Sequence, residues 1–138
     1  MKLVSACLIG CQCRYNGKSK TDERILKLIE NGETLIPICP EQLGGLPTPR
    51  LPSEQKDDKV FTNEGKEVTE NFLRGAEETL RIAKLLKIKE AILKQKSPSC
   101  GCGKIFDGTF SGTLINGDGE TTKLLKENGI KVISEEDL

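Results

Sequence analysis

Three short apolar segments of this chain each end near a cysteine, and this pattern constrains the fold more than any other feature. The three are residues 3–6 before Cys7, residues 35–38 before Cys39, and residues 91–93 before the loop that holds Cys100. Short apolar runs bounded by turn residues are typical of buried strands. Cysteine can itself be a small core residue, but these cysteines come at the strand ends, where open α/β sheets bind ligands. The sequence therefore predicts that three strand ends bring three thiols to one site.

Helical patterns separate the predicted strands. The predicted strands span residues 2–9, 33–39, 89–95 and 130–134. The first predicted helix begins after a cap at Ser19 or Thr21 and ends at Asn31-Gly32, and the second runs from Thr69 to residue 87. The third begins after a cap at Thr121 or Thr122 and ends at Asn128-Gly129. This alternation is typical of βα units. We therefore predict one α/β domain over residues 1–138, with a Rossmann-like fold in which helices cover both faces of a mainly parallel sheet. The strand at 33–39 is apolar throughout, which predicts that both of its faces are covered.

Residues 42–67 are the least regular part of the sequence. They contain a run of glycine and proline that cannot form a helix or a central strand, although Val60-Phe61 predicts a short edge strand. Loops of this length in a compact domain are often functional, so we expect a wall or lid over the site. Further on, residues 104–110 predict a short strand or turn, and residues 116–119 predict a glycine-rich turn.

The composition limits the compartment and the partners. The chain has 21 lysines and arginines and 21 acidic residues, so no net charge favours a long nucleic acid or an anionic membrane. It opens on strand-like sequence without a signal peptide, and no apolar run approaches the ~20 residues that a membrane span needs. We therefore expect a cytoplasmic protein, in which six cysteines indicate metal or redox chemistry more than disulfides.

The absence of histidine narrows the chemistry further, because it excludes Cys/His zinc sites and imidazole catalysis. The pairs Cys11/Cys13 and Cys100/Cys102 are Cys-x-Cys motifs, whereas zinc pairs normally enclose two to four residues. A four-cysteine zinc site is therefore possible but poorly matched. No Cys-x-x-Cys redox motif occurs. Single cysteines on separate loops can instead bind an iron–sulfur cluster, and three ligands leave one iron open to a substrate.

Polar residues near the predicted strand ends are candidates for the chemistry. Glu41 lies two residues after the second strand-end cysteine and, without histidine, it is the most natural general base. The alternative is an exposed loop glutamate, the usual fate of this residue type. Arg14 and Lys18 lie on the loop after the first strand, where they could reach the same pocket or simply be solvated. The segment Gly117–Thr122 could hold a phosphate at the start of the next helix, although a turn with a helix cap explains it equally well.

Six segments together resemble the motif set of the thiouracil desulfidase family. They are Ser5–Gly10, Cys13–Gly17, Cys39–Glu41, Gly44–Arg50, Ser97–Gly101 and Phe106–Gly112. The resemblance runs from about residue 4 to residue 134. It implies a non-redox enzyme that converts a thiolated uracil base or nucleotide, of the 4-thiouracil or 4-thiouridine monophosphate type, to the oxo form with release of sulfide. It also implies a 4Fe–4S cluster held by Cys7, Cys39 and Cys100, with one open iron.

The other cysteines and the length of the chain refine this resemblance. Cys13 occupies a position where some family members carry valine, and Cys11 and Cys102 lie outside the pattern. Some relatives have an additional C-terminal domain associated with tRNA substrates; this sequence has none, so we expect a small thiopyrimidine or its nucleotide as the partner. Two other classes of protein remain possible. One is a binding module in which zinc or a closed cluster cross-links loops, and the other is a thiol-based redox protein.

The resemblance and the residues together suggest a mechanism. The thiocarbonyl sulfur would bind the open iron, which draws charge from the ring carbon, while Glu41 accepts a proton from the attacking water. Ser97, as a second catalytic residue, and Ser99, as a substrate-binding residue, would bind the developing anion or the ring. Arg14 and Lys18 are further candidates for substrate binding.

Overall fold

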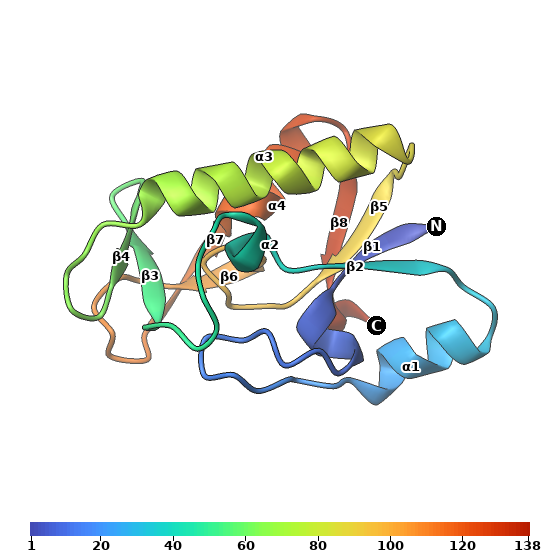
Figure 1. The fold of residues 1–138 in the computed structure, drawn as a ribbon, viewed down its shortest axis with the longest axis horizontal. Helices are drawn as coiled ribbons and strands as arrows, with labels where there is room; N and C mark the ends of the chain where they lie inside the picture. Colours follow the sequence, from blue (N-terminus) through green and yellow to red (C-terminus); the bar gives the residue numbers. More distant parts are fainter.

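The sheet at the centre of the fold has four strands, all of them parallel. The computed structural model describes residues 1–138, and the four strands are β1 (Lys2–Ser5), β2 (Leu35–Ile38), β5 (Glu90–Leu93) and β8 (Lys131–Ser134). Their order is β2-β1-β5-β8, so the chain extends the sheet on both sides of β1 (Figure 1). The predicted α/β fold with a parallel sheet is confirmed.

Helices cover both faces of this sheet, as predicted. On one face lie α3 (Thr69–Leu85) and α4 (Glu120–Glu127), which pack against each other, and on the other lies α1 (Glu23–Glu30) (Figure 1). Successive side chains of a strand point to opposite faces; in β1, Leu3 therefore packs with α3 and α4, and Val4 packs with α1. None of the helices combines the length and the apolar character that crossing a membrane requires.

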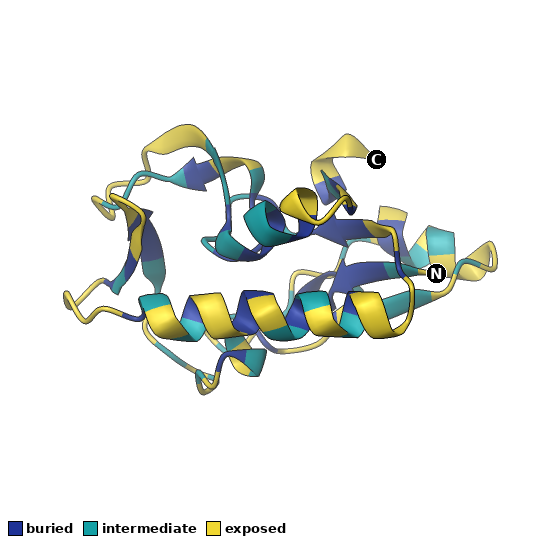
Figure 2. Ribbon diagram, turned by 90° about the horizontal axis from the view of Figure 1, so that it is seen from above, coloured by how far each residue is buried: buried dark blue, intermediate teal, exposed yellow.

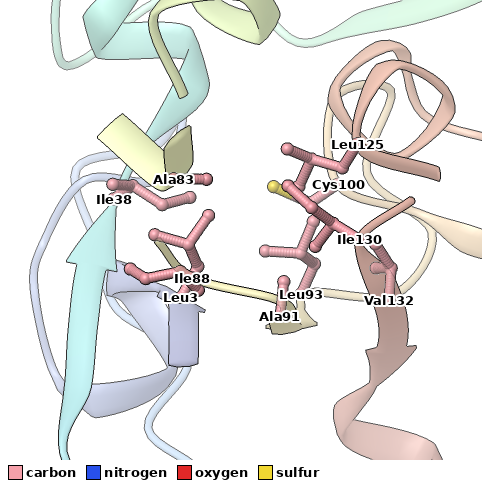
Figure 3. Packing of buried hydrophobic residues seen from close by; sticks show 10 residues of the cluster. All are labelled: Leu3, Ile38, Ala83, Ile88, Ala91, Leu93, Cys100, Leu125, Ile130 and Val132. Carbon is pink, nitrogen blue, oxygen red and sulfur yellow. The ribbon is translucent and has the colours of Figure 1, made fainter. Parts of the chain in front are cut away.

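The larger part of the core lies between the sheet and helices α3 and α4. Figure 3 shows its ten buried residues, which are Leu3, Ile38, Ala83, Ile88, Ala91, Leu93, Cys100, Leu125, Ile130 and Val132. Burying one leucine side chain contributes about 1.5–3 kcal/mol, so this layer fixes the position of the strands whose ends carry the cysteines. Cys100 itself belongs to this layer, and the core therefore extends directly into the site.

The longest helix, α3, has one face on the core. Buried and exposed residues alternate along it (Figure 2), and Phe72, Ala76 and Ala83 are among its buried residues. Leu73 and Leu86 are each 40% exposed. The first points away from the core on the helix surface, and the second is the C-cap residue, beyond the last helical turn.

Helix α1 starts and stops through local hydrogen bonding. Its N-cap is Asp22, whose side chain accepts a hydrogen bond from the amide of Arg24 at 2.9 Å. The prediction of Ser19 or Thr21 was therefore wrong by one to three residues, because the aspartate is the better placed acceptor for the first free amides. The predicted end at Asn31-Gly32 is confirmed, and Gly32 has a φ of +93°, which favours glycine.

Two predicted strands differ from those in the structure. β1 ends at Ser5 and is followed by the 3₁₀ turn η1 (Ala6–Ile9), which Gly10 terminates with a φ of +106°. β2 is shorter than predicted and is an edge strand. Both of its faces are covered, as predicted, because Ile36 and Ile38 pack on the side of α3 and α4 and Leu35 packs on the side of α1. Only Pro37 is exposed. A proline lacks the amide hydrogen that a central strand would use, which explains this position.

Two antiparallel hairpins extend the fold beyond the sheet (Figure 1). They are β3 (Ser53–Lys56) with β4 (Lys59–Thr62) and β6 (Cys102–Phe106) with β7 (Leu114–Asp118). β4 contains the predicted edge strand at Val60-Phe61. β3 was missed because its sequence is polar, and the turn predicted at 116–119 lies largely within β7. The N-cap of α4 is consequently Gly119, and the threonines predicted to cap it lie buried inside the helix.

Candidate active site

A cavity of about 450 Å³ opens at the carboxyl ends of β1, β2 and β5. β2 and β5, the next two strands of this sheet along the chain, lie on opposite sides of β1. The carboxyl end of β1 is therefore the topological switch point, where open α/β folds bind ligands. Cys7, Cys39 and Cys100 all line the cavity. The three strand ends therefore bring their thiols to one site, as the sequence predicted.

Each of these thiols reaches the cavity through a different local structure. Cys7 lies in the turn η1, directly after β1. Cys39 directly follows β2 and is the N-cap residue of the short helix α2 (Pro40–Leu43). Cys100 lies in the loop after β5. Cys7 and Cys100 are buried and Cys39 is partly buried, so all three are held by surrounding structure.

A fourth thiol, that of Cys13, also lines the cavity and is 6% exposed. Its carbonyl oxygen accepts a weak hydrogen bond from the Cys39 thiol, with Sγ and O 3.8 Å apart. Cys11, by contrast, is exposed, and neither Cys11 nor Cys102 is among the lining residues. The cysteines therefore separate into four at the cavity and two outside it.

Burial and contact with other thiols raise the pKa of three cavity thiols, those of Cys13, Cys39 and Cys100. Contact with the Cys39 thiol lowers the pKa of Cys13, but contact with Cys7 and burial outweigh it and raise that pKa to about 11. Contact with Cys13 and burial raise the pKa of Cys39, and burial raises the pKa of Cys100 to about 12. A metal that binds such thiols must displace their protons, because thiolate is the binding form.

The donor set fits an iron–sulfur cluster. Thiolate is the usual protein ligand of such clusters, and three cysteines on three separate loops face one cavity here. No group of three or more cysteine, aspartate or glutamate side chains is positioned to hold a single metal ion. A four-iron cluster has a different requirement, because its irons are separate atoms and each iron that has a protein ligand takes a thiolate of its own.

Glu41 is held at the cavity wall by two donors. It lies in the first turn of α2, and its side chain is only 15% exposed. Its Oε1 accepts from Nε of Arg50 at 3.0 Å, and its Oε2 accepts from Oγ of Ser99 at 2.9 Å. The alternative of an exposed loop glutamate is therefore wrong. Two donors, one on each oxygen, fix the carboxylate in place.

Ser97 and Ser99 form a directed chain of hydrogen bonds to this carboxylate. The Ser97 hydroxyl oxygen accepts from the amides of Ser99 and Cys100, at 3.1 and 3.0 Å. Both of its lone pairs are then used, so its own hydrogen must point to Oγ of Ser99, 2.9 Å away. Ser99 in turn donates to Glu41. The order of donation is therefore Ser97 to Ser99 to Glu41.

Several cationic side chains line the cavity, but not all of those predicted. Arg14 lines the cavity, and its guanidinium lies 5.8 Å from the centre of the Tyr15 ring. Lys18 is exposed and is not brought to the cavity, whereas Lys20 is a lining residue. Lys94, Lys96 and Arg50 also line it. Lys94 is engaged by Glu135 at 3.1 Å, so it is less available to a ligand than Arg14 or Lys20.

The predicted phosphate site at Gly117–Thr122 is wrong. The first amides of α4 are already used, since Glu120 donates to the carbonyl of Pro98 and Thr121 to that of Ser99, both at 2.9 Å. A Cβ on Gly119 would overlap the backbone of Ser99. The start of α4 therefore supports the serine loop and leaves no room for an anion.

The irregular segment after α2 supplies one wall of the cavity, as predicted. Pro52, Ser53 and Glu54 are lining residues. Glu54 Oε1 accepts from the amides of Gly108 and Phe110, at 3.0 and 3.1 Å. The wall thus fixes the loop between β6 and β7, which belongs to the last of the six motif segments.

Comparison with known proteins agrees with this site. The family model described as 2-thiouracil desulfurase matches residues 3–137. The chain belongs to this desulfurase family. It is 45% identical to a Bacillus subtilis (strain 168) protein, "Uncharacterized protein YbbK", over all of this chain and 97% of that protein. A solved structure described as "[4Fe-4S]-dependent thiouracil desulfidase TudS" matches with a TM-score of 0.93 and 45% identity, over 99% of this chain and 91% of that chain.

Membership of the desulfurase family confirms the resemblance drawn from the six motifs. Within the site, the main residues that the sequence did not single out are Arg50 and Lys20. Arg50 ends one of the six motifs, but its sequence position gives no sign that it contacts Glu41. Lys20 lies two residues beyond the predicted Lys18, and only the path of the loop decides which of the two faces the cavity.

Proposed function

We propose that this protein is an iron–sulfur-dependent desulfidase that hydrolyses the carbon–sulfur bond of a thiolated uracil base or its nucleotide. The observation that carries the proposal is the meeting of three strand-end thiols and a partly buried carboxylate in one cavity. The reaction exchanges sulfur for oxygen, with water as the co-reactant and hydrogen sulfide as the second product. It needs no net electron transfer.

In this proposal, Cys7, Cys39 and Cys100 hold a 4Fe–4S cluster. When bound, the cluster supplies a Lewis-acidic iron without a protein ligand, which polarises the thiocarbonyl group of the substrate. The family assignment and the description of TudS support this cofactor. Cys13 lines the same cavity but is not among the proposed ligands.

Glu41 acts as the general base. Its carboxylate lies at the cavity wall beside the Cys39 ligand and accepts a proton from the water that attacks the ring carbon. Two donors hold it, so little reorganisation is needed when the proton arrives.

The serine pair orients this carboxylate. Ser97 donates to Ser99, and Ser99 donates to Oε2 of Glu41. The protonated Glu41 then returns the proton that it took from water to the departing sulfide in the same cavity. The loop amides keep Ser97 in place throughout.

Arg14 and Lys20 are the proposed binding residues for the phosphate of a nucleotide substrate. Both line the cavity, and no carboxylate forms an ion pair with either, unlike Arg50 and Lys94. Lys18, the other predicted residue, would have to reach the phosphate from outside the cavity. The substrate proposed on this basis is a monophosphate of the 4-thiouridine type.

Purification in the absence of oxygen tests the cofactor and the activity together. We expect a brown protein with about four irons and four sulfides per chain, which releases sulfide from 4-thiouracil without added reductant. A colourless protein with bound zinc and no turnover would instead support the binding module in which zinc cross-links loops. A metal-free protein whose cysteines cycle between thiol and disulfide would support the redox protein.

The phosphate site has its own test. We expect kcat/KM for 4-thiouridine monophosphate to exceed that for 4-thiouracil by roughly ten- to a hundredfold, because a charge-assisted contact contributes about 1.5–3 kcal/mol. Arg14→Gln or Lys20→Gln should reduce the value for the nucleotide and leave that for the base unchanged. Lys18→Gln is the control outside the cavity. Equal efficiency for base and nucleotide in the native protein would remove the phosphate site.

A further inference from the structure

Arg50 is a buried cation at the cavity whose role none of the preceding steps explains. Its side chain is 7% exposed, and a buried charge of this kind is normally paired with an opposite charge. The one carboxylate with which it forms an ion pair is that of Glu41, with Nε and Oε1 3.0 Å apart. The charge of Arg50 is therefore directed at the proposed general base.

The rest of the guanidinium is fixed by neutral oxygens. Nη2 donates to the carbonyl of Cys13 at 2.9 Å, and Nη1 donates to Oγ1 of Thr48 at 2.9 Å and to the carbonyl of Pro47 at 3.2 Å. The backbone amide of Arg50 donates to the carbonyl of Tyr15 at 2.8 Å. Arg50 thus joins the loop after η1, its own proline-rich segment and the start of α2.

This arrangement uses the planar fork of arginine. Donors on all three guanidinium nitrogens are occupied at once, and their directions are fixed relative to one another, which a lysine ammonium cannot reproduce. Two contacts on different oxygens together set the orientation of the Glu41 carboxylate. Oε1 is held by Arg50, and Oε2 is held by the serine chain.

We propose that Arg50 is a positioning residue for Glu41, which orients its carboxylate towards the cavity. The proposal rests on the proposed function, in which Glu41 accepts a proton from water. Arg50 acts through Glu41, so its contribution lies in kcat and not in substrate binding. It also follows that Arg50 contributes little once Glu41 has lost its basicity.

A double-mutant cycle on the cluster-loaded protein tests this directly. Arg50→Met and Arg50→Lys are each made in the native protein and in the Glu41→Gln variant, with iron content and KM measured for all. We expect Arg50→Met to lower kcat by about 100-fold, the effect of misplacing a catalytic group, at unchanged KM and iron content. Arg50→Lys should restore part of the loss. In the Glu41→Gln background, either change should lower kcat less than about threefold.

The matched control for this experiment is an arginine far from the cavity. Arg81→Met removes an arginine that pairs with Glu78 at 3.1 Å on the surface, and it should leave kcat unchanged. If Arg50→Met does not retain its iron, the kcat values of Arg50→Lys in the two backgrounds are compared instead, because lysine keeps the charge. Equal losses in both backgrounds, or a native kcat for Arg50→Lys, would overturn the positioning role. Near-native kcat for Glu41→Gln alone would instead reject the base in the proposed function.

Discussion

At the scale of single residues, position at the cavity separates the cysteines that can act in the site from those that cannot. Cys7 and Cys100 are buried at the cavity, Cys39 is partly buried there, and Cys11 is exposed to solvent. The two kinds differ in what surrounds them and not in their spacing along the chain. The Cys-x-Cys pairs of the sequence therefore do not act as pairs, because each contributes one thiol to the cavity and one outside it.

This separation predicts the outcome of single substitutions. Replacing Cys7, Cys39 or Cys100 by alanine should abolish both iron retention and sulfide release, because the cluster would lose one of its three protein ligands. Cys11→Ala and Cys102→Ala are the controls and should keep both. Iron and sulfide analysis after anaerobic purification measures the result. The ligand assignment would be refuted if Cys11→Ala lost the cluster while Cys7→Ala kept it.

Some residues of the candidate site could be predicted from the sequence, and others could not. The strand-end cysteines and Glu41 could be placed from sequence, because apolar runs followed by turn residues locate the ends of strands. Arg50 could not, because its contact with Glu41 spans nine residues and depends on how the segment between them turns back. Likewise, the choice between Lys18 and Lys20 depends on the course of a loop without a regular period.

At the scale of elements, close contact between α2 and α3 fixes the residue that carries the proposed base. A Cβ on Gly75 of α3 would overlap the carbonyl oxygen of Pro40, and a Cβ on Gly44 would overlap that of Asn71. Both glycines are therefore needed for the two helices to approach this closely. Glu41 follows Pro40 directly, so the contact also sets the depth of Glu41 in the cavity.

Gly75→Ala tests this contact. Alanine is the better helix former by about 1 kcal/mol, but the overlap costs about 1–3 kcal/mol or displaces α2. We expect a fall in Tm of about 4 °C for each kcal/mol of net loss, together with a lower kcat and retained iron. Glu77→Ala, on the exposed face of the same helix, is the control. A more stable and fully active Gly75→Ala variant would contradict the close packing.

Elements without a hydrophobic period were the ones that the sequence did not predict. β3 reads Ser-Glu-Gln-Lys, yet Glu54 and Gln55 are buried because hydrogen bonds satisfy both side chains. β7 contains Asn116 and Gly117, which usually indicate a turn. Pairing with β6 overrides this local preference. In both cases long-range contacts decide the structure, and a local pattern cannot reveal them.

At the scale of the whole molecule, the fold separates stability from chemistry. The parallel sheet and the helices on both faces enclose the apolar core (Figure 1). The proposed site residues gather in loops and short helices at one end of the sheet. The hairpins β3–β4 and β6–β7 contribute to the walls of the cavity without joining the sheet. This arrangement supports the proposal that a small substrate enters from the carboxyl ends of the strands.

The most direct test of the central claim is turnover in ¹⁸O-labelled water without a reductant. If Glu41 activates water in this cavity, the product from 4-thiouracil must carry one ¹⁸O atom at the former thiocarbonyl carbon, with one sulfide released per product. Mass spectrometry of the product and a sulfide assay measure both quantities in the same sample. Product without the label, or turnover that requires an electron donor, would contradict hydrolytic desulfidation.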